Sequence, residues 1–229
     1  MRHLLFVIGL AACHPIHPYT TLTAGDDGHP IAVGSTLQAF SGWAARCQTK
    51  GGFWSDSDPE YTDCHHKPVR LEVVCIEPCA VEQPRVEAPH TAWVTMRALA
   101  PGRVVVETRS TRLDKRKTQI KRFTFDVLPP QRLALACGAK YDTFETCGPH
   151  GVSAVKPVVR AQVFVDGEEQ DRVTIRVNGE PREVGIGKAF SLSELYPDAR
   201  ATDDAIAPGT YLVELELAGM VERFQVTAR

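Results

Sequence analysis

The sequence lacks a long hydrophobic run and an excess of charge of either sign. No apolar stretch in its 229 residues reaches the roughly 18 residues that a membrane-spanning helix needs. The chain has 26 Lys and Arg against 28 Asp and Glu, so its charge gives no reason to expect a nucleic-acid partner. With 43% hydrophobic and 24% charged residues, the composition excludes wholesale disorder and predicts one large or two ordinary folded domains.

Common catalytic motifs are also missing. Gly-x-Ser-x-Gly, Gly-x-x-x-x-Gly-Lys and His-Glu-x-x-His do not occur in the sequence. Four histidines, His65, His66, His90 and His150, are scattered near Cys or Pro without an obvious nucleophile. We therefore expect a protein that is not an enzyme and uses no cofactor. A hydrolase whose triad assembles only in space stays open as an alternative, because triads are recognised by geometry.

The N-terminal segment has the layout of a secretory signal. Arg2 makes the N-terminus positive, residues 4–10 are apolar, and the small residues Ala11 and Ala12 follow. Leu10-Ala11-Ala12-Cys13 resembles the lipobox of bacterial lipoproteins. That resemblance implies a signal peptide of residues 1–12, cleavage before Cys13 and lipid attachment at its thiol and new amine.

The lipobox resemblance also implies a location. Several acyl chains would anchor the protein stably in a membrane of the bacterial cell envelope. The residue after Cys13 is His14, not the Asp that favours inner-membrane retention, so the resemblance implies the outer membrane. Residues 13–21 contain Pro15 and Pro18 and are predicted to form an extended tether.

Six further cysteines form the next pattern. An even number in an exported chain predicts disulfides, and proximity favours Cys47–Cys64, Cys75–Cys79 and Cys137–Cys147 among 15 pairings. The alternative is a metal-binding envelope protein that uses thiolate and imidazole ligands. Its candidate ligands are Cys64, His65 with its neighbour His66, Cys75 and Cys79.

The remaining chain predicts strands and almost no helix. Short runs rich in β-branched residues alternate with Gly or Pro turns, and residues 172–177 alternate strictly between polar and apolar. Asp166-Gly167, Asn178-Gly179 and Ala218-Gly219 lie between runs and predict hairpin turns. The sequence thus predicts an all-β protein. The predicted strands are 69–75, 103–109, 122–127, 158–165, 172–177, 210–217 and 222–227, with a short helical turn at 190–196.

An internal repeat divides the chain in two. Residues 98–107 recur as 205–214 with six of ten positions identical, and each copy precedes a strand that contains Arg-Phe, at Arg122-Phe123 and Arg223-Phe224. The layout resembles bacterial immunoglobulin-like domains. The resemblance implies two Ig-like β-sandwich domains in tandem, residues 22–128 and 132–229, joined by a linker at 129–131.

Two features are candidate binding surfaces. One is an irregular insertion, residues 43–66, whose aromatic residues form either an exposed platform or the insertion's own core. The other is a basic hairpin that either meets anionic groups or is an edge kept soluble by charge. The candidate binding residues are Trp43, Phe53, Trp54 and Tyr61 in the insertion, and Arg112, Lys115, Arg116 and Lys117 in the hairpin.

These patterns favour a membrane-anchored, non-catalytic structural or binding module of the cell envelope. The expected partners are the membrane, through the N-terminal lipid, and another envelope protein or a glycan.

Overall fold

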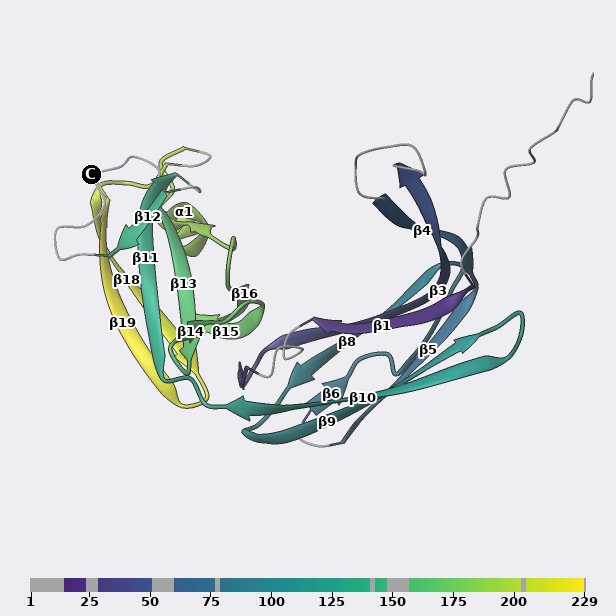
Figure 1. Cartoon of the computed structure of the whole chain (residues 1–229). Helices are drawn as coiled ribbons and strands as arrows, with labels where there is room; N and C mark the ends of the chain where they lie inside the picture. The colour runs from purple at the N-terminus through teal and green to yellow at the C-terminus, as the bar shows by residue number, and fades with distance from the viewer. Residues whose placement is uncertain are drawn as a thin grey trace, which may run out of the picture.

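The protein is all-β, as the sequence predicts. The computed structural model describes residues 15–23, 29–50, 60–76, 79–140, 143–147, 157–202 and 205–228 (Figure 1). Helix is limited there to the single turn α1 (Leu192–Leu195) and the 3₁₀ turn η1 (Pro197–Ala199). Within these ranges, no helix has the length and apolar character required to cross a bilayer.

The first half folds into two facing sheets. The sheet named here the β1 sheet has the order β1-β3-β8-β6, with β4 paired to β3. The sheet named the β10 sheet has the order β2-β10-β9-β5-β7. The bounds are β1 (His17–Thr23), β2 (Ile31–Ala32), β3 (Thr36–Lys50), β4 (Glu60–Lys67), β5 (Val69–Ile76), β6 (Cys79–Val81), β7 (Arg85–Ala88), β8 (Thr91–Ala98), β9 (Gly102–Arg112) and β10 (Lys117–Leu128).

The second half repeats the arrangement with shorter strands. One sheet has the order β12-β11-β13-β14, with β17 paired to β13, and the other has the order β16-β15-β18-β19. The bounds are β11 (Arg132–Lys140), β12 (Thr143–Thr146), β13 (Val158–Val165), β14 (Glu168–Glu169), β15 (Val173–Val177), β16 (Glu180–Val184), β17 (Phe190–Ser191), β18 (Gly209–Leu217) and β19 (Met220–Ala228).

Each half has the strand order of an immunoglobulin-like sandwich. In the first, β1, β3 and β8 form one sheet and β5, β9 and β10 the other, which corresponds to strands A, B, E against C, F, G. In the second, β11, β13 and β17 face β15, β18 and β19 in the same way. The tandem sandwich architecture expected from the sequence is therefore confirmed.

Alternating side chains give each sandwich its own core. Strand β8 buries every second residue, and so do β5 and β18 along much of their lengths. The first core contains Trp43, Leu71 and Met96, whereas the second contains Val163 and Leu215. The expected turns are present as well, because Asp166, Asn178 and Ala218 all have positive φ and each precedes a glycine that does too.

The repeated segments occupy equivalent positions. Each copy leads into the strand that pairs with the last strand of its sandwich. In the first sandwich β9 pairs with β10, and in the second β18 pairs with β19. In each pair a glutamate lies opposite the arginine of Arg-Phe, and the two form an ion pair, Glu107 with Arg122 at 2.9 Å and Glu214 with Arg223 at 2.7 Å. These matching contacts support the interpretation of the repeat as a duplication.

Hydrogen bonds join the two sandwiches at a bend. The Thr36 amide donates to the Arg172 carbonyl at 2.7 Å, and the Thr174 amide donates to the Gly34 carbonyl at 2.9 Å. Gly34 has a φ of +85° and its α-carbon lies so close to the Thr174 carbonyl that a Cβ would be only 2.8 Å away. The buried Ala32 amide also donates to the Gln170 side chain. Short turns from both halves thus fix the bend seen in Figure 1.

The structure corrects two boundaries. Residues 17–21, expected in the tether, belong to β1, an edge strand in which Pro18 is tolerated because one side of the strand needs no ladder partner. The expected irregular insertion is largely regular, because β3 continues to Lys50 and β4 pairs with it from Glu60 to Lys67. The tip of this arm, residues 51–59, lies outside the described residues.

Candidate binding surfaces

Three disulfides join the cysteines in the pairs that proximity favours. They are Cys47–Cys64, Cys75–Cys79 and Cys137–Cys147, with Cα–Cα distances of 5.8, 6.1 and 5.0 Å. The first links β3 to β4 and so closes the arm. The second closes the connection from β5 to β6. The third joins β11 to the residue after β12. Cys13 lies outside the described residues.

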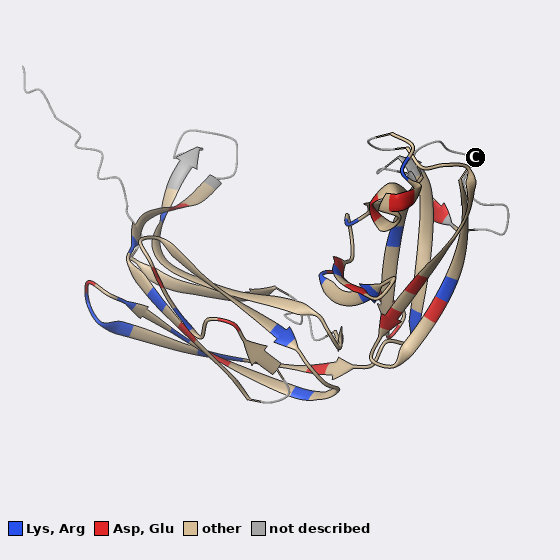
Figure 2. Ribbon diagram, turned by 180° about the vertical axis from the view of Figure 1, so that it is seen from behind, with Lys and Arg blue, Asp and Glu red and all other residues tan. Residues whose placement is uncertain are grey.

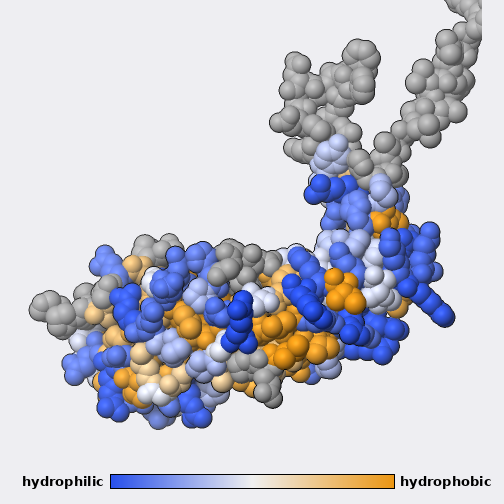
Figure 3. All heavy atoms as spheres, turned by 60° about the horizontal axis from the view of Figure 1, so that its bottom comes forward, coloured by the Kyte–Doolittle hydropathy of each residue, from blue (hydrophilic) through white to orange (hydrophobic). Residues whose placement is uncertain are grey.

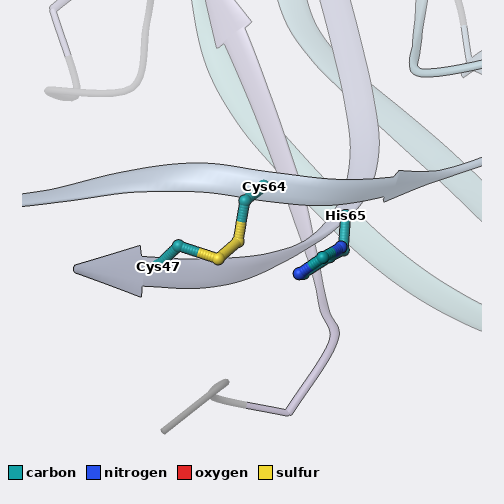
Figure 4. Close-up of side chains that lie close together, drawn as sticks. All are labelled: Cys47, Cys64 and His65. Carbon is teal, nitrogen blue, oxygen red and sulfur yellow. A yellow bond between two sulfur atoms is a disulfide. The ribbon is translucent and has the colours of Figure 1, made fainter. Parts of the chain in front are cut away.

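The cysteines predicted as alternative metal ligands are paired in disulfides and are therefore not thiolates. Cys64 and Cys75 are in different disulfides, and in the described part of the chain only Cys47, Cys64 and His65 form a group of three whose potential ligand atoms lie within 4.8 Å of one another (Figure 4). Because a disulfide sulfur lacks the negative charge that makes a thiolate a ligand, this cluster is no metal site while the bond is intact. The alternative metal site at Cys64, His65, Cys75 and Cys79 therefore requires reduction of both bonds.

The alternation of side chains between the two faces of the sheet is interrupted at His65 and His66 on β4. His65 has a φ of +51°, and the β3–β4 register shifts between the pairs Trp43–Lys67 and Ala45–Cys64. A bulge at this point turns His66 toward His90, and the two rings meet edge to face with centroids 5.4 Å apart.

The aromatic residues of the arm do not share one surface. Trp43 is only 1% exposed, packs in the first core, and its indole N–H donates to the Ser110 hydroxyl at 3.0 Å. Its burial corrects the expectation that it contributes to an exposed platform. Tyr61, on β4, is 47% exposed. Phe53 and Trp54 lie outside the described residues.

The basic hairpin has one structural and three exposed cations. Arg112 is buried, and its guanidinium donates two hydrogen bonds to the Asp114 carboxylate, at 2.6 and 2.8 Å. These bonds lower the pKa of Asp114 and raise that of Arg112. Arg112 is therefore engaged in shaping the turn. Lys115, Arg116 and Lys117 are exposed at the tip, which Figure 2 shows as a run of basic residues.

The tip lies at the end of the first sandwich where the chain enters. His17, the first residue of β1, is opposite Ala44, and the neighbouring Trp43 is opposite Lys67. The Lys117 ammonium lies 6.0 Å from the centre of the Trp43 ring. Lys67 and the three tip residues thus lie at the end of the first sandwich where β1 begins, together with Asp114, which pairs with Arg112; we call this end the basic pole.

The outer face of the β10 sheet pairs its own charges. Arg70 contacts Glu87, Arg85 contacts Glu72, and Glu107 receives hydrogen bonds from both Arg109 and Arg122, which lower its pKa. Hydrophobic side chains are also exposed in patches between hydrophilic ones on the face in Figure 3. The arginines and glutamates of this face are thus paired with one another, and such exposed ion pairs contribute little to stability.

The sequence reasoning missed an aromatic cluster on the outer face of the β1 sheet. Phe40 on β3 and Trp93 on β8 are directly opposite, and their ring centroids are 4.6 Å apart at 30°. Trp93 is 50% exposed. The signal was available, because alternation through residues 36–42 and 91–97 places Phe40 and Trp93 on the polar face.

Comparisons with known proteins leave the function open. No protein-family model matches the chain, and no curated protein matches it. Fibronectin(III)-like modules of Clostridium thermocellum CbhA align over 92% of this chain and 94% of theirs, at 12% identity and a TM-score of 0.27. The D0-D1 domain of intimin aligns over 86% of this chain and 91% of its own, at 12% identity and a TM-score of 0.27. The YadV chaperone aligns over 91% of this chain and 98% of its own, at 6% identity and a TM-score of 0.29. These similarities are too weak to transfer a function.

Proposed function

We propose that this protein is a lipid-anchored, non-catalytic binding module of the bacterial cell envelope, held in the outer membrane through Cys13. The lipid places the first sandwich close to the membrane surface, and the second sandwich extends the molecule away from the anchor. Partners then bind to the folded part, as envelope proteins or glycans.

The observation that carries the proposal is the location of the basic pole. Only three residues lie between Cys13 and His17, where β1 begins, and the four residue steps from one to the other span at most about 14 Å. The exposed cations Lys115, Arg116 and Lys117 lie at this same end. Basic residues near an anionic membrane contribute roughly 1 kcal/mol each. The chain therefore combines a lipid signal with a basic patch, a pairing that gives stable attachment.

Cell fractionation and mass spectrometry test the anchor. In a diderm bacterial host, we expect the native chain in the outer-membrane fraction, with the mass of the lipid on its N-terminal peptide at Cys13. Cys13→Ser should move the protein to the soluble fraction, because the acyl chains supply most of the attachment energy.

The matched control removes two other cysteines. Cys47→Ser with Cys64→Ser leaves the lipobox intact and should keep the protein in the membrane fraction. An N-terminal peptide that carries no lipid, or retention of Cys13→Ser in membranes washed with high salt, would overturn the proposed anchor.

A further inference from the structure

The disulfide of the arm differs from the other two in its surroundings. The Cys75–Cys79 disulfide packs against the first core, and the Cys137–Cys147 disulfide packs in and against the second. The Cys47–Cys64 disulfide belongs to neither core, and both of its cysteines are only half-buried. A disulfide that solvent and thiols can reach is reduced more readily than one packed in a core. The disulfide of the arm is therefore the one that a reductant reaches most easily.

The arm also brings an imidazole to the two sulfurs of this bond. Side chains alternate between faces along a regular strand, so His65 would point away from its neighbour Cys64. His65 instead has a φ of +51°, in the left-handed region that residues other than glycine seldom occupy. Figure 4 shows the result, with the side chains of Cys64 and His65 on the same side of β4. A ring nitrogen of His65 and the sulfurs of Cys47 and Cys64 all lie within 4.8 Å of one another.

The paired strands hold the two cysteines in place without the bond. Cys64 is opposite Ala45, and Cys47 is opposite Thr62 two positions further along the arm. Both cysteine side chains therefore leave the same face of the β3–β4 pair. The Cys64 sulfur lies 3.3 Å from the Ala45 carbonyl oxygen, which is an acceptor for the thiol proton after reduction. Reduction thus leaves two thiols and an imidazole close together on one face.

Two thiolates and an imidazole are ligands for zinc. Zn²⁺ binds cysteine sulfur at about 2.3 Å and histidine nitrogen at about 2.0 Å in a tetrahedral arrangement, which separates neighbouring ligand atoms by about 3.5–3.8 Å. From bonding distance the two sulfurs have to move apart by about 2 Å to reach this separation. Calcium and magnesium prefer oxygen ligands and do not suit the group. With three protein ligands, the fourth position of the ion is taken by water.

We propose that Cys47, Cys64 and His65 form a redox-controlled zinc site on the arm. A dithiol of a partner protein supplies two electrons and two protons. Its own thiols become a disulfide, and the Cys47–Cys64 bond becomes two thiols. Zn²⁺ then displaces both thiol protons, which pass to the solvent, and His65 binds through a ring nitrogen. The oxidised arm binds no zinc, because its sulfurs carry no negative charge.

This site is independent of the proposed membrane anchor. It uses neither the lipid at Cys13 nor the basic pole, so the unlipidated Cys13→Ser chain retains all three ligands. Failure of the zinc site would leave the anchor untouched, and failure of the anchor would leave the zinc site untouched. The two proposals are therefore tested separately.

Stepwise reduction tests the accessibility of the bond. The folded Cys13→Ser chain is treated with a limiting amount of a phosphine reductant, and the free thiols are alkylated and located by peptide mass spectrometry. We expect Cys47 and Cys64 to be labelled before the other four cysteines, because their bond lies outside both cores.

Metal titration tests the site itself. The partly reduced chain, without alkylation, is titrated with Co²⁺ as a spectroscopic probe and then with Zn²⁺. We expect one Co²⁺ per chain with thiolate-to-metal charge-transfer absorption, displacement of Co²⁺ by Zn²⁺, and no such absorption from the oxidised chain. His65→Ala should weaken Co²⁺ binding roughly tenfold or more, because it removes one of three protein ligands.

The matched control is the neighbouring histidine. The ring of His66 contacts His90 instead of the sulfurs, so His66→Gln should leave the affinity for Co²⁺ unchanged. Thermal unfolding shows that each variant is folded. The proposal is overturned if another disulfide opens before Cys47–Cys64, if the partly reduced chain binds no Co²⁺, or if His65→Ala binds Co²⁺ as tightly as its parent. An equal loss of affinity in His66→Gln and His65→Ala would also overturn it.

Discussion

The two sandwiches share a framework but differ at the ends of their last hairpins. Past the shared ion pairs, β9 and β10 continue from Glu107 to Arg112 and end in a four-residue turn. The β18–β19 hairpin continues only from Glu214 to Leu217 and closes through Ala218-Gly219. The first sandwich also extends β3 and β4 into an arm with its own disulfide.

The comparison indicates which features distinguish one copy of a duplicated framework from the other. Residues that both copies keep, such as the Glu–Arg ion pair and the Val–Phe pair beside it, stabilise the sheet. Among the described residues, the basic hairpin tip, the disulfide-closed arm and the outward-facing Phe40–Trp93 pair occur only in the first copy. They lie on the sandwich that follows Cys13. The second copy carries its own disulfide and short glycine turns.

The largest effect is expected in the first core. Trp43→Ala removes a fully buried side chain and its hydrogen bond to Ser110, and should lower the free energy of unfolding by about 3–5 kcal/mol. Urea denaturation followed by circular dichroism measures the change. Trp93→Ala is the matched control on the outer face and should cost less than about 1 kcal/mol. Equal losses for both variants would contradict the assignment of one tryptophan to the core.

Removal of a disulfide should have the next largest effect on stability, and the effect can be measured in both sandwiches. Replacing Cys47 and Cys64 by Ser opens a loop of sequence separation 17, and replacing Cys137 and Cys147 opens one of separation 10. Each double variant should lose about 3 kcal/mol, since the entropy of the unfolded chain grows only slowly with loop length. The Cys75–Cys79 pair, with separation 4, should cost less. A larger loss from that shortest loop would be inconsistent with the entropic account.

The smallest stability effect concerns the ion pair of the first sandwich. Hydrogen bonds from Arg122 and Arg109 lower the pKa of Glu107 below the ordinary 4.5. A lowered folded-state pKa gives stability that is present above pH 4.5 and is lost as the pH falls through the folded value. Glu107→Gln should therefore lose less stability than the native chain between pH 7 and pH 3. Urea midpoints at both pH values decide this, and identical pH profiles would contradict it.

Much of the fold was predictable because its signals are local. Alternating runs, Gly turns and the repeat located the main strands, since each depends on a few neighbouring residues. The start of β1 could not be predicted in this way. Pro15 and Pro18 indicate an extended tether, and only the pairing with β3 shows that residues 17–23 form a strand. The regular pairing of β3 with β4 in the arm could not be predicted either, for the same reason. A strand's partner is a property of the fold, so β4 looked irregular in isolation.

The candidate sites were predicted less well than the fold. The cysteine pairs followed from proximity, but Trp43 was grouped with Tyr61 by its place in the sequence, whereas the bulged β3–β4 pairing buries Trp43 and exposes Tyr61. Phe40 and Trp93 are 53 positions apart, and only the β3–β8 register brings their rings together. Alternation alone places each of the two rings on the polar face, but no local pattern predicts that they are cross-strand neighbours.

The most direct test of the central claim is vesicle binding by the basic pole. Unlipidated Cys13→Ser protein is sedimented with vesicles of phosphatidylglycerol and phosphatidylcholine, and with phosphatidylcholine alone. We expect binding only to the anionic vesicles, decreasing with salt. Changing Lys115, Arg116 and Lys117 together to Ser should weaken it on the order of 100-fold, whereas changing Arg176, Lys188 and Arg200 of the second sandwich should not. Equal binding by both triple variants, or none by the parent chain, would contradict the assignment of this pole to the membrane.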